Sequence, residues 1–328
     1  MSSDVSSAEP PSAESTTRDR TTRDHTAPDH GGTDLASPAG FRLAPDQDPF
    51  FVFDFQAVDG PADDGEGWVD GRRWSTYWDV ERLCRGPEPR PDWVVTDRAA
   101  VDTDRGVLKT GKEADVFLLE RAVDGEPDRS VVMAAKRYRA EEHRTFHRSS
   151  AYTDGRRTRS SRDARAMAKK TEHGRAVASG RWAWAEWESL KHFWSVGVPV
   201  PYPVQIDGTE ILMELVTVDG EAAPRLAQTR PCGALLASYF EQLRDAMAVL
   251  ARHGVAHGDL SPYNVLAAGD RVVVIDLPQV VDIVGNPAGP DYLMRDCHNV
   301  CSWFAARGLA ERIADEHALF ADLLGCVF

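Results

Sequence analysis

Apolar side chains recur at helical spacing in two long segments of the chain. In the first segment they stand at i, i+4, i+7 and i+11: Ala183, Trp187, Leu190 and Trp194. In the second they again share one face: Leu236, Phe240, Leu243, Met247 and Leu250. This spacing predicts two amphipathic helices, each with one face in a core. Gly254 follows the second segment, where glycine commonly ends a helix.

Shorter apolar runs bounded by turn-forming residues predict strands. Residues 116–120 and 131–136 are separated by the turn sequence DGEPD, which predicts a β-hairpin. Residues 211–216 form another such run. A second hairpin is predicted where the sequence VL leads through the turn AAGD into RVVVID, which ends at Asp276. Helices and strands are therefore mixed along the chain, as in the α+β class.

The N-terminal third differs in composition from the rest. Residues 1–45 are rich in Ser, Thr, Asp, Pro and Gly and have few large apolar side chains, which predicts a disordered tail. In residues 46–104 aromatic side chains alternate with acidic and proline-rich breaks. We expect this segment to be an extension packed on a main domain that begins near residue 105.

The charge of the chain is strongly acidic but unevenly distributed. A formal net charge of -14 argues against binding nucleic acid through bulk charge. Residues 137–181 nevertheless hold thirteen Lys or Arg against five Asp or Glu. This basic insert could contact a phosphate-rich or acidic partner, and a solvated loop and helix face explains it at least as well.

Membrane and secretion signals are not apparent in the sequence. No stretch approaches the roughly eighteen apolar residues of a membrane helix, and the N-terminus lacks the basic and apolar regions of a signal peptide. The five cysteines show no paired framework, which fits a reducing compartment. We therefore expect a cytoplasmic protein. Cys297 and Cys301 stand beside His298 and could hold a metal, but two buried cysteines are the simpler interpretation.

The loop HGDLSPYNVL, residues 257–266, places an acid and an amide five residues apart between apolar segments. The predicted hairpin after it would bring Asn264 and Asp276 to neighbouring strand ends. Two hard oxygen ligands suit Mg²⁺, which binds one or two carboxylates together with substrate phosphates. Asp259 is then left to orient or deprotonate an attacking hydroxyl. This set is typical of phosphoryl transfer.

A nucleotide site also needs a phosphate-covering loop and a lysine. Residues 106–113, GVLKTGKE, nearly match a Walker A motif, but Glu113 replaces the hydroxyl residue and a strand follows where a P-loop needs a helix. A glycine-bearing turn between two strands, with Gly111 and Lys112 facing the nucleotide, is the alternative. Lys136, at the end of the next strand, stands where a phosphate-pairing lysine should be. Its carboxylate partner on the following helix could be Glu186 or Glu188.

With these residues in place, the sequence resembles the RIO family of atypical protein kinases. The matching segments are KTGKEADVF (109–117), AAKRYR (134–139), WAWAEWESL (182–190), VGVPVPYP (196–203), LMELV (212–216), HGDLSPYNVL (257–266), VVVIDLPQ (272–279) and RDCHNV (295–300). The resemblance implies a two-lobed, kinase-like α+β fold with an N-lobe at 105–216 and a C-lobe at 217–328. Only 52 residues follow Asp276, so the C-lobe should be truncated, as in the family.

The resemblance also implies a nucleotide site for ATP. Lys136 would hold its phosphates, and Glu186, rather than Glu188, would pair with the lysine. Glu214 and Val216 would bind adenine through their backbones, as a hinge.

The catalytic residues follow from the same resemblance. Asp259 would be the catalytic aspartate, and Asn264 and Asp276 would be Mg²⁺ ligands. In the family the residue matching Asp276 is also linked to an aspartyl-phosphate intermediate and to ATPase behaviour. Asp296 would brace the catalytic loop from a later helix.

Three functions follow as hypotheses. The leading one is an ATP- and Mg²⁺-dependent serine/threonine kinase or ATPase of RIO type that acts on a protein acceptor. The second is a small-molecule phosphotransferase of the aminoglycoside type, which also carries HGDL-x-x-x-N followed by ID. The third is a nucleotide-gated module on a ribosomal particle, in which the basic insert 137–181 contacts RNA phosphates.

Overall fold

The structure is a computed structural model that describes residues 71–139, 172–278 and 280–327, with side chains described from residue 179 onward in the second range. All of these residues belong to one compact unit, Ala39–Phe328. The predicted tail, residues 1–45, lies outside the described residues. So do residues 46–70 of the predicted extension and residues 140–171 of the basic insert.

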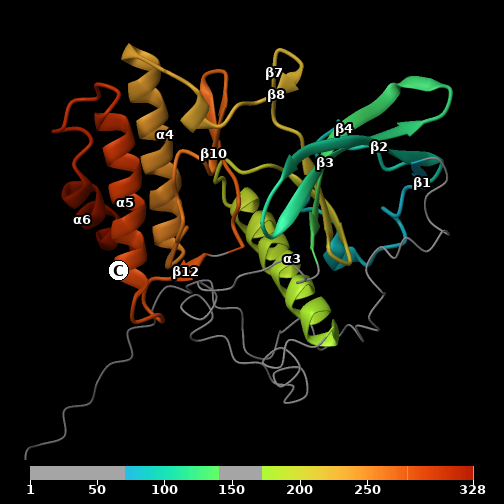
Figure 1. Cartoon of the computed structure of the whole chain (residues 1–328), viewed down its shortest axis with the longest axis horizontal. Coiled ribbons are helices and arrows are strands. Elements are labelled where there is room, and N and C mark those ends of the chain that lie inside the picture. The colour runs from blue at the N-terminus through green and yellow to red at the C-terminus, as the bar shows by residue number, and fades with distance from the viewer. Residues whose placement is uncertain (1–70, 140–171, 279, 328) are drawn as a thin grey trace, which may run out of the picture. The chain divides into compact units, whose positions relative to one another are not determined.

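A six-stranded antiparallel sheet forms one lobe, with strand order β1-β2-β3-β4-β6-β5 (Figure 1). The strands are β1 (Arg72–Trp74), β2 (Ala100–Thr110), β3 (Ala114–Val123), β4 (Glu126–Tyr138), β5 (Pro203–Asp207) and β6 (Glu210–Glu214). The predicted first hairpin is β3 and β4, in which Ala122 faces Ser130. Both strands extend beyond the apolar runs 116–120 and 131–136, and only Asp124 and Gly125 of the DGEPD sequence lie between them.

The predicted boundary between residues 104 and 105 falls inside strand β2. Within the predicted extension, β1 pairs with β2 across Arg73 and Asp102. The 3-10 helix η2 (Arg82–Cys84) lies against β5, where Arg85 forms an isolated bridge with Gln205. The described part of the extension therefore belongs to the same sheet lobe.

Helix α3 (Glu172–Ser195) packs against this sheet and carries the first predicted apolar stripe. Ala183, Trp187 and Leu190 are buried, and Trp194 is half-buried. The indole Nε1 of Trp187 donates a hydrogen bond to the carbonyl of Leu83 at 3.0 Å. Its single polar atom is thus paired while its rings fill the core. The tryptophans are core residues, as the spacing predicted.

A helical lobe follows, with three helices packed together: α4 (Gly233–Arg252), α5 (Gly289–Ala305) and α6 (Glu316–Val327). Three two-stranded sheets and one 3-10 helix complete it: β7 (Thr217–Val218) with β8 (Glu221–Ala222), β9 (Val255–Ala256) with β12 (Val281–Asp282), β10 (Val265–Ala268) with β11 (Arg271–Val274), and η3 (Leu226–Gln228). All five apolar residues of the second predicted helix are buried in α4, and Gly254 follows its C-cap with φ +73°.

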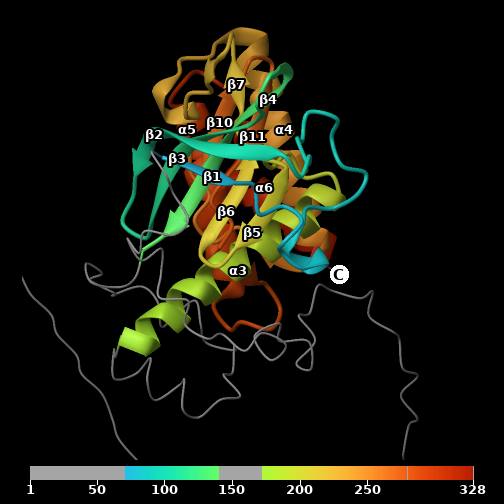
Figure 2. The ribbon, with the colours of Figure 1, turned by 90° about the vertical axis from the view of Figure 1, so that its right-hand side faces the viewer.

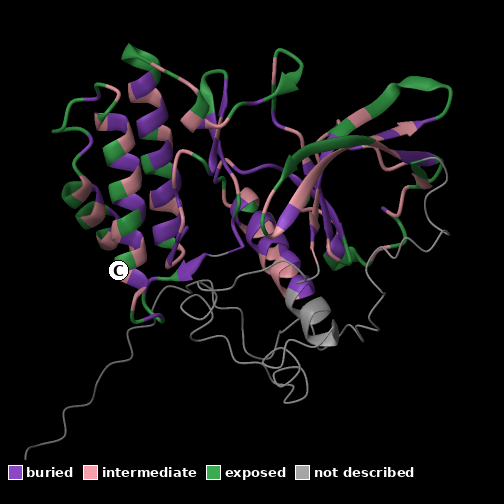
Figure 3. Cartoon of the chain, viewed as in Figure 1, coloured by how far each residue is buried: buried purple, intermediate pink, exposed green. Residues whose placement is uncertain are grey.

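The two lobes share one hydrophobic core. Buried residues of α3 and β6 join those of α4, α5 and the β10–β11 hairpin in a single cluster, and in Figure 3 the ribbon of these elements is coloured as buried over much of its length. Viewed from the side, the sheet stands in front of the helical lobe (Figure 2). The α+β, two-lobed fold expected from the sequence is confirmed, with only three helices in the described part of the second lobe. No helix among the described residues is long and apolar enough to cross a membrane.

Candidate active site

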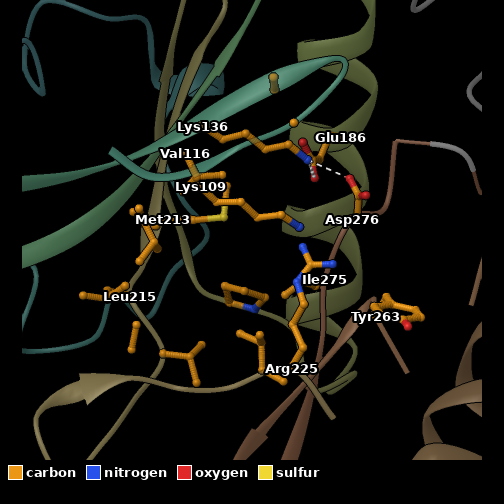
Figure 4. Close-up of a pocket in the computed structure, with 18 of the residues that line it drawn as sticks. Lys109, Val116, Lys136, Glu186, Met213, Leu215, Arg225, Tyr263, Ile275 and Asp276 are labelled. Atoms are coloured by element: carbon orange, nitrogen blue, oxygen red, sulfur yellow. Dashed lines mark hydrogen bonds and ion pairs between the residues drawn. The ribbon is translucent and has the colours of Figure 1, made fainter. Parts of the chain in front are cut away.

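A cleft of about 1420 Å³ is lined by residues of both lobes. The sheet lobe contributes β2, β3, β4 and the turn between β2 and β3, and the helical lobe contributes the catalytic-loop segment and the end of β11. Figure 4 shows Lys136, Glu186 and Asp276 together on one side of this cleft, and Met213 and Leu215 on the other. The cleft is large enough for a nucleotide and part of a second substrate.

Lys136 bridges two carboxylates at the polar end of the cleft. Its Nζ lies 2.7 Å from Glu186 Oε1 and 2.8 Å from Asp276 Oδ1. Burial by itself would lower the pKa of the ammonium, but the charges of Asp276 and Glu186 outweigh it and raise the pKa. Lys136 is therefore a fixed cation at any pH the folded protein meets.

Glu186 is held from two sides. Only 2% of its side chain is exposed, and its second oxygen accepts a hydrogen bond from the hydroxyl of Tyr138. Lys136 and Tyr138 lie two residues apart on β4, so their side chains share one face of the sheet. This is the face that packs against α3. Glu188, the other candidate on this helix, instead pairs with Lys191 at 2.7 Å. The structure thus brings Glu186, and not Glu188, to the lysine.

Asp276 follows strand β11 in a left-handed backbone conformation, with φ +69°. A non-glycine residue adopts this conformation at a cost, and such residues gather at functional sites. Its side chain is 48% exposed and faces the cleft. Lys136 is the main cause of a lowered pKa at this carboxyl, against the effect of burial. Asp276 therefore stands ionised, with part of its surface open to a ligand.

A buried acid on α5 binds the loop 257–264, to which Arg295 and Asn299 of the same helix also donate hydrogen bonds. Asp296 accepts hydrogen bonds from the backbone N–H groups of Gly258 at 2.7 Å and of Leu260 at 2.8 Å. Burial raises its pKa to about 6, although His257 and the two N–H groups lower it in part. These two bonds fix the backbone on either side of Asp259, whose side chain lines the cleft.

Asn264 is oriented by the same loop. Its amide nitrogen donates to the carbonyl of Asp259 at 2.9 Å, which leaves the amide oxygen as the group that can bind a cation. Its backbone carbonyl accepts from Ile275 N–H at 3.0 Å, next to Asp276. As predicted, the β10–β11 hairpin brings Asn264 and Asp276 to neighbouring strand ends, with Val265 opposite Val274.

The other end of the cleft is an apolar slot beside the link between the lobes. Its walls come from both lobes: Val116, Ala134, Met213, Leu266 and Ile275. The predicted hinge residues Glu214 and Val216 line it, and the carbonyl of Val216 accepts from Ala223 N–H at 2.8 Å. A flat aromatic base is the kind of group that such a slot accepts.

Gly111 and Lys112 occupy the turn between β2 and β3 and also line the cleft. The N–H of Gly111 donates to the carbonyl of Ala114 at 3.1 Å, and a Cβ on Gly111 would lie 2.6 Å from that same oxygen. Glycine is therefore required by close packing of the turn on itself. Every predicted site residue except Asn264 lines the cleft, and Asn264 is hydrogen-bonded to the backbone carbonyl of Asp259.

Three further residues at this site were not predicted. Tyr138 could have been found from its i, i+2 relation to Lys136 on a strand. Lys109 and Arg225 line the cleft from opposite sides and point toward its centre (Figure 4). They lie far apart in sequence, so no local pattern connects them.

Cys297 and Cys301 are buried free thiols, and the described residues contain no cluster of three or more His, Cys, Asp or Glu that could hold a metal.

Comparison with known proteins identifies the family of the chain. A family model described as the RIO domain matches residues 122–318. The RIO-type serine/threonine-protein kinase Rio1 of Haloferax volcanii is 34% identical over 225 residues, which cover 69% of this chain and 70% of that protein. Rio1 of Methanocaldococcus jannaschii is 30% identical over 200 residues, 61% of this chain and 62% of that protein.

Other relatives match over smaller shares of their length. The serine/threonine-protein kinase RIO3 of Mus musculus is 29% identical over 44% of this chain, and this match spans 28% of the mouse protein. Among solved structures, the Rio2 kinase from Chaetomium thermophilum in an ADP/Mg²⁺-phosphoaspartate complex is 22% identical, with a TM-score of 0.47, over 68% of this chain and 62% of that one. The family match extends over more than half of the sequence, and the chain belongs to the RIO family of atypical serine/threonine protein kinases.

Proposed function

We propose that this chain is an ATP- and Mg²⁺-dependent serine/threonine kinase, an ATPase, or both, and that the cleft around Lys136 is its active site. The observation that carries the proposal is the bridge from Lys136 to Glu186 and Asp276 at 2.7 and 2.8 Å. In phosphoryl transfer the protein mainly positions groups and neutralises charge. A lysine fixed between a helix carboxylate and a metal-binding carboxylate can do both: it holds the phosphates in position and neutralises part of their charge.

The nucleotide would lie along the cleft with its base in the apolar slot. The backbones of Glu214 and Val216 would bind adenine, and Gly111 and Lys112 would cover the phosphates. The fit is supported by the slot's apolar walls and by the tight turn at Gly111, which allows close approach of the backbone. Lys136 would contact the phosphates at the polar end.

Asn264 and Asp276 fit Mg²⁺ by their chemistry and orientation. The amide oxygen of Asn264 is left available by the bond from its nitrogen to Asp259, and Asp276 is ionised and half-exposed. One carboxylate and one amide are a sparse protein shell, which suits an ion that keeps waters and takes phosphate oxygens. When bound, the ion would neutralise charge on the phosphates.

Asp259 would orient the acceptor hydroxyl of a protein substrate. Its side chain lines the cleft, and the hydrogen bonds that the two flanking N–H groups donate to Asp296 fix the loop that carries it. In the ATPase version, an Asp276 oxygen attacks the terminal phosphorus while the bond to the ADP oxygen breaks. Water then cleaves the aspartyl phosphate, which returns the carboxylate and releases phosphate.

Radiolabelled ATP with Mg²⁺ tests the proposal in wild type, Asp259→Ala and Asp276→Asn. Stable label on Ser or Thr that is lost in Asp259→Ala would support a protein kinase. Hydroxylamine-sensitive label that is lost in Asp276→Asn, together with ADP release, would support the ATPase. Turnover by both variants at the wild-type rate would contradict the assignment of the site.

The basic insert 137–181 lies mostly outside the described residues, so its contact with RNA or a ribosomal subunit stays a prediction. The small-molecule phosphotransferase also gains no support, since the matched family is that of RIO kinases. The cytoplasmic location expected from the sequence likewise stays a prediction.

A further inference from the structure

Lys109 and Arg225 are two cations of the cleft that have no carboxylate partner among the described residues, and Lys112, in the turn beside Gly111, is a third. Lys109 and Arg225 both line the cleft, and neither forms an ion pair with any residue of the described ranges. By contrast, Lys136 and Arg139, which line the same cleft, are paired with carboxylates. A protein that positions unpaired cations at one cavity has a surplus of positive charge for a ligand to neutralise.

The two side chains converge from opposite walls. Lys109 belongs to β2 and pairs with Val116 on the strand after the glycine turn. Arg225 precedes η3 and forms an isolated bridge with Leu266, two residues beyond Asn264. Figure 4 shows their charged ends directed toward the same space, close to Asp276. This space lies between the turn at Gly111 and the β10–β11 hairpin.

The electrostatics of the pair agree with this placement. Burial is the main cause of a lowered pKa at Lys109, and the charges of Arg225 and Lys136 lower it further. Burial also lowers the pKa of Arg225. Burial therefore costs free energy for the charged form of each side chain, and an anion bound between them would reduce this cost. Asp276 offsets only part of this cost at both residues.

Resting on the proposed function, we infer that Lys109 and Arg225 form a clamp for the terminal phosphate of the nucleotide. The inner phosphates would already meet Lys136 at the polar end. The backbone N–H of Ala227, two residues after Arg225, donates to the carbonyl of Pro262 at 2.9 Å, which connects the segment that carries Arg225 to the loop that carries Asp259. A planar guanidinium and a compact ammonium together match a phosphoryl group with several free oxygens.

This clamp predicts selectivity for triphosphate over diphosphate. Only the triphosphate would reach both cations, and it would draw the β2 end and the catalytic-loop side together. ADP would keep its contacts with the hinge and Lys136. The site would then sense the terminal phosphate directly, through a residue from each lobe.

Isothermal titration with Mg²⁺ tests the clamp in the full chain, with ADP and the non-hydrolysable β,γ-imido analogue of ATP as probes. Lys109→Ala and Arg225→Ala should each weaken analogue binding by about tenfold, as expected for loss of one charge-assisted hydrogen bond. ADP binding should change by less than about twofold. Arg225→Lys keeps the charge but loses the planar guanidinium. Its affinity for the analogue should therefore lie between those of wild type and Arg225→Ala.

Arg244→Ala is the matched control, because Arg244 is exposed on α4 and pairs only with the neighbouring Asp245 among the described residues. It removes the same charge outside the cleft and should bind both probes as wild type does. Equal losses for ADP and the analogue, or no loss for the analogue, would overturn the clamp while leaving the nucleotide site intact. Wild type that binds neither probe would overturn the proposed function itself, and the clamp with it.

Discussion

The hydroxyl of Tyr138 donates a hydrogen bond to Glu186 Oε2, the oxygen that Lys136 does not contact. Both side chains are buried, and burial is the main cause of a raised pKa at the tyrosine, which therefore stays a neutral donor. The glutamate thus has one fixed orientation, with a cation on one oxygen and a hydroxyl on the other. In the proposed active site, Tyr138 would be a positioning residue for Lys136.

Tyr138→Phe should remove this orientation with little change in volume. One oxygen of a buried carboxylate loses its partner, so we expect a loss of about 1–3 kcal/mol in unfolding free energy. We also expect a several-fold decrease in kcat/KM for ATP turnover. Urea unfolding and steady-state kinetics measure the two effects.

Tyr239→Phe provides the comparison for Tyr138→Phe. The hydroxyl of Tyr239 donates to the carbonyl of Gly269 at 2.5 Å, away from the cleft. Tyr239→Phe should lower the free energy of unfolding without lowering kcat/KM of the folded protein. Equal kinetic losses in both variants would show that Tyr138 acts only through stability.

Asp296→Asn should change how stability depends on pH. The pKa of Asp296 is raised from 3.8 to about 6, so between those values the folded chain binds a proton that the unfolded chain has lost. Through this group, wild type gains stability as pH falls across that window and loses it as pH rises. The variant lacks this dependence, so its stability relative to wild type should improve by about 3 kcal/mol between pH 3.5 and pH 7.

Activity should show the opposite preference at this position. A carboxylate accepts from both Gly258 N–H and Leu260 N–H, whereas an asparagine offers one oxygen and one nitrogen. Asp296→Asn should therefore lower kcat by about tenfold or more by loosening the loop that carries Asp259. Unfolding curves at several pH values and initial rates at pH 7 measure both effects. A variant with the wild-type pH slope and rate would contradict this account of the brace.

The catalytic loop could be predicted from sequence because its parts are local. Asp259 and Asn264 lie within one loop, and Asp276 ends the hairpin that follows, so a short motif determines their meeting. The partner of Lys136 was harder to predict from local sequence, since two glutamates, Glu186 and Glu188, stand two residues apart on α3. The residues alone left both open and the family resemblance selected Glu186, whereas the structure distinguishes them by the packing of Tyr138 and Lys136 against that helix.

Strand β2 shows why the start of the sheet lobe was misplaced in sequence. The segment AVDTDRG is too polar for an ordinary strand. In the structure Asp102 is fully buried, and its Oδ1 lies 2.6 Å from the guanidinium Nε of Arg121 on β3. A buried charge paired across two strands leaves no apolar pattern, so the strand becomes visible only with its partner.

Gly111→Ala should damage nucleotide binding more than stability. The new Cβ would lie 2.6 Å from the carbonyl oxygen of Ala114, which is backbone and cannot rotate away. The turn must therefore open, and the backbone that covers the phosphates moves with it. We expect about a tenfold weaker ATP affinity, measured by titration calorimetry, with a change in unfolding free energy below about 2 kcal/mol.

Gly325→Ala is the control for Gly111→Ala. Gly325 lies in helix α6, and a Cβ there meets no atom within 4 Å. Alanine favours a helix over glycine, so this variant should gain up to about 1 kcal/mol of stability and keep its ATP affinity. If Gly111→Ala bound ATP as tightly as wild type, the turn would not cover the phosphates.

A histidine pair links α3 to the end of α4 and should make that link sensitive to acid. His192 Nε2 lies 3.2 Å from His253 Nδ1. Burial first, and then His253, lowers the pKa of His192 below its usual 6.5. As pH falls through 6.5 the unfolded chain takes up a proton that the folded chain resists, so stability is lost across that range. Glu186 lies on the same helix, and strain at this link would reach the lysine bridge.

His253→Gln should reduce this acid sensitivity, because it removes the like charge that opposes protonation of His192. Between pH 7.5 and pH 5.5 the variant should lose less stability than wild type. His317→Gln changes a histidine that is 79% exposed, and it should follow the wild-type curve. Urea unfolding across this pH range compares the three proteins. Parallel curves for wild type and His253→Gln would mean that other groups control the acid response, since the pair is the specific contact that the substitution removes.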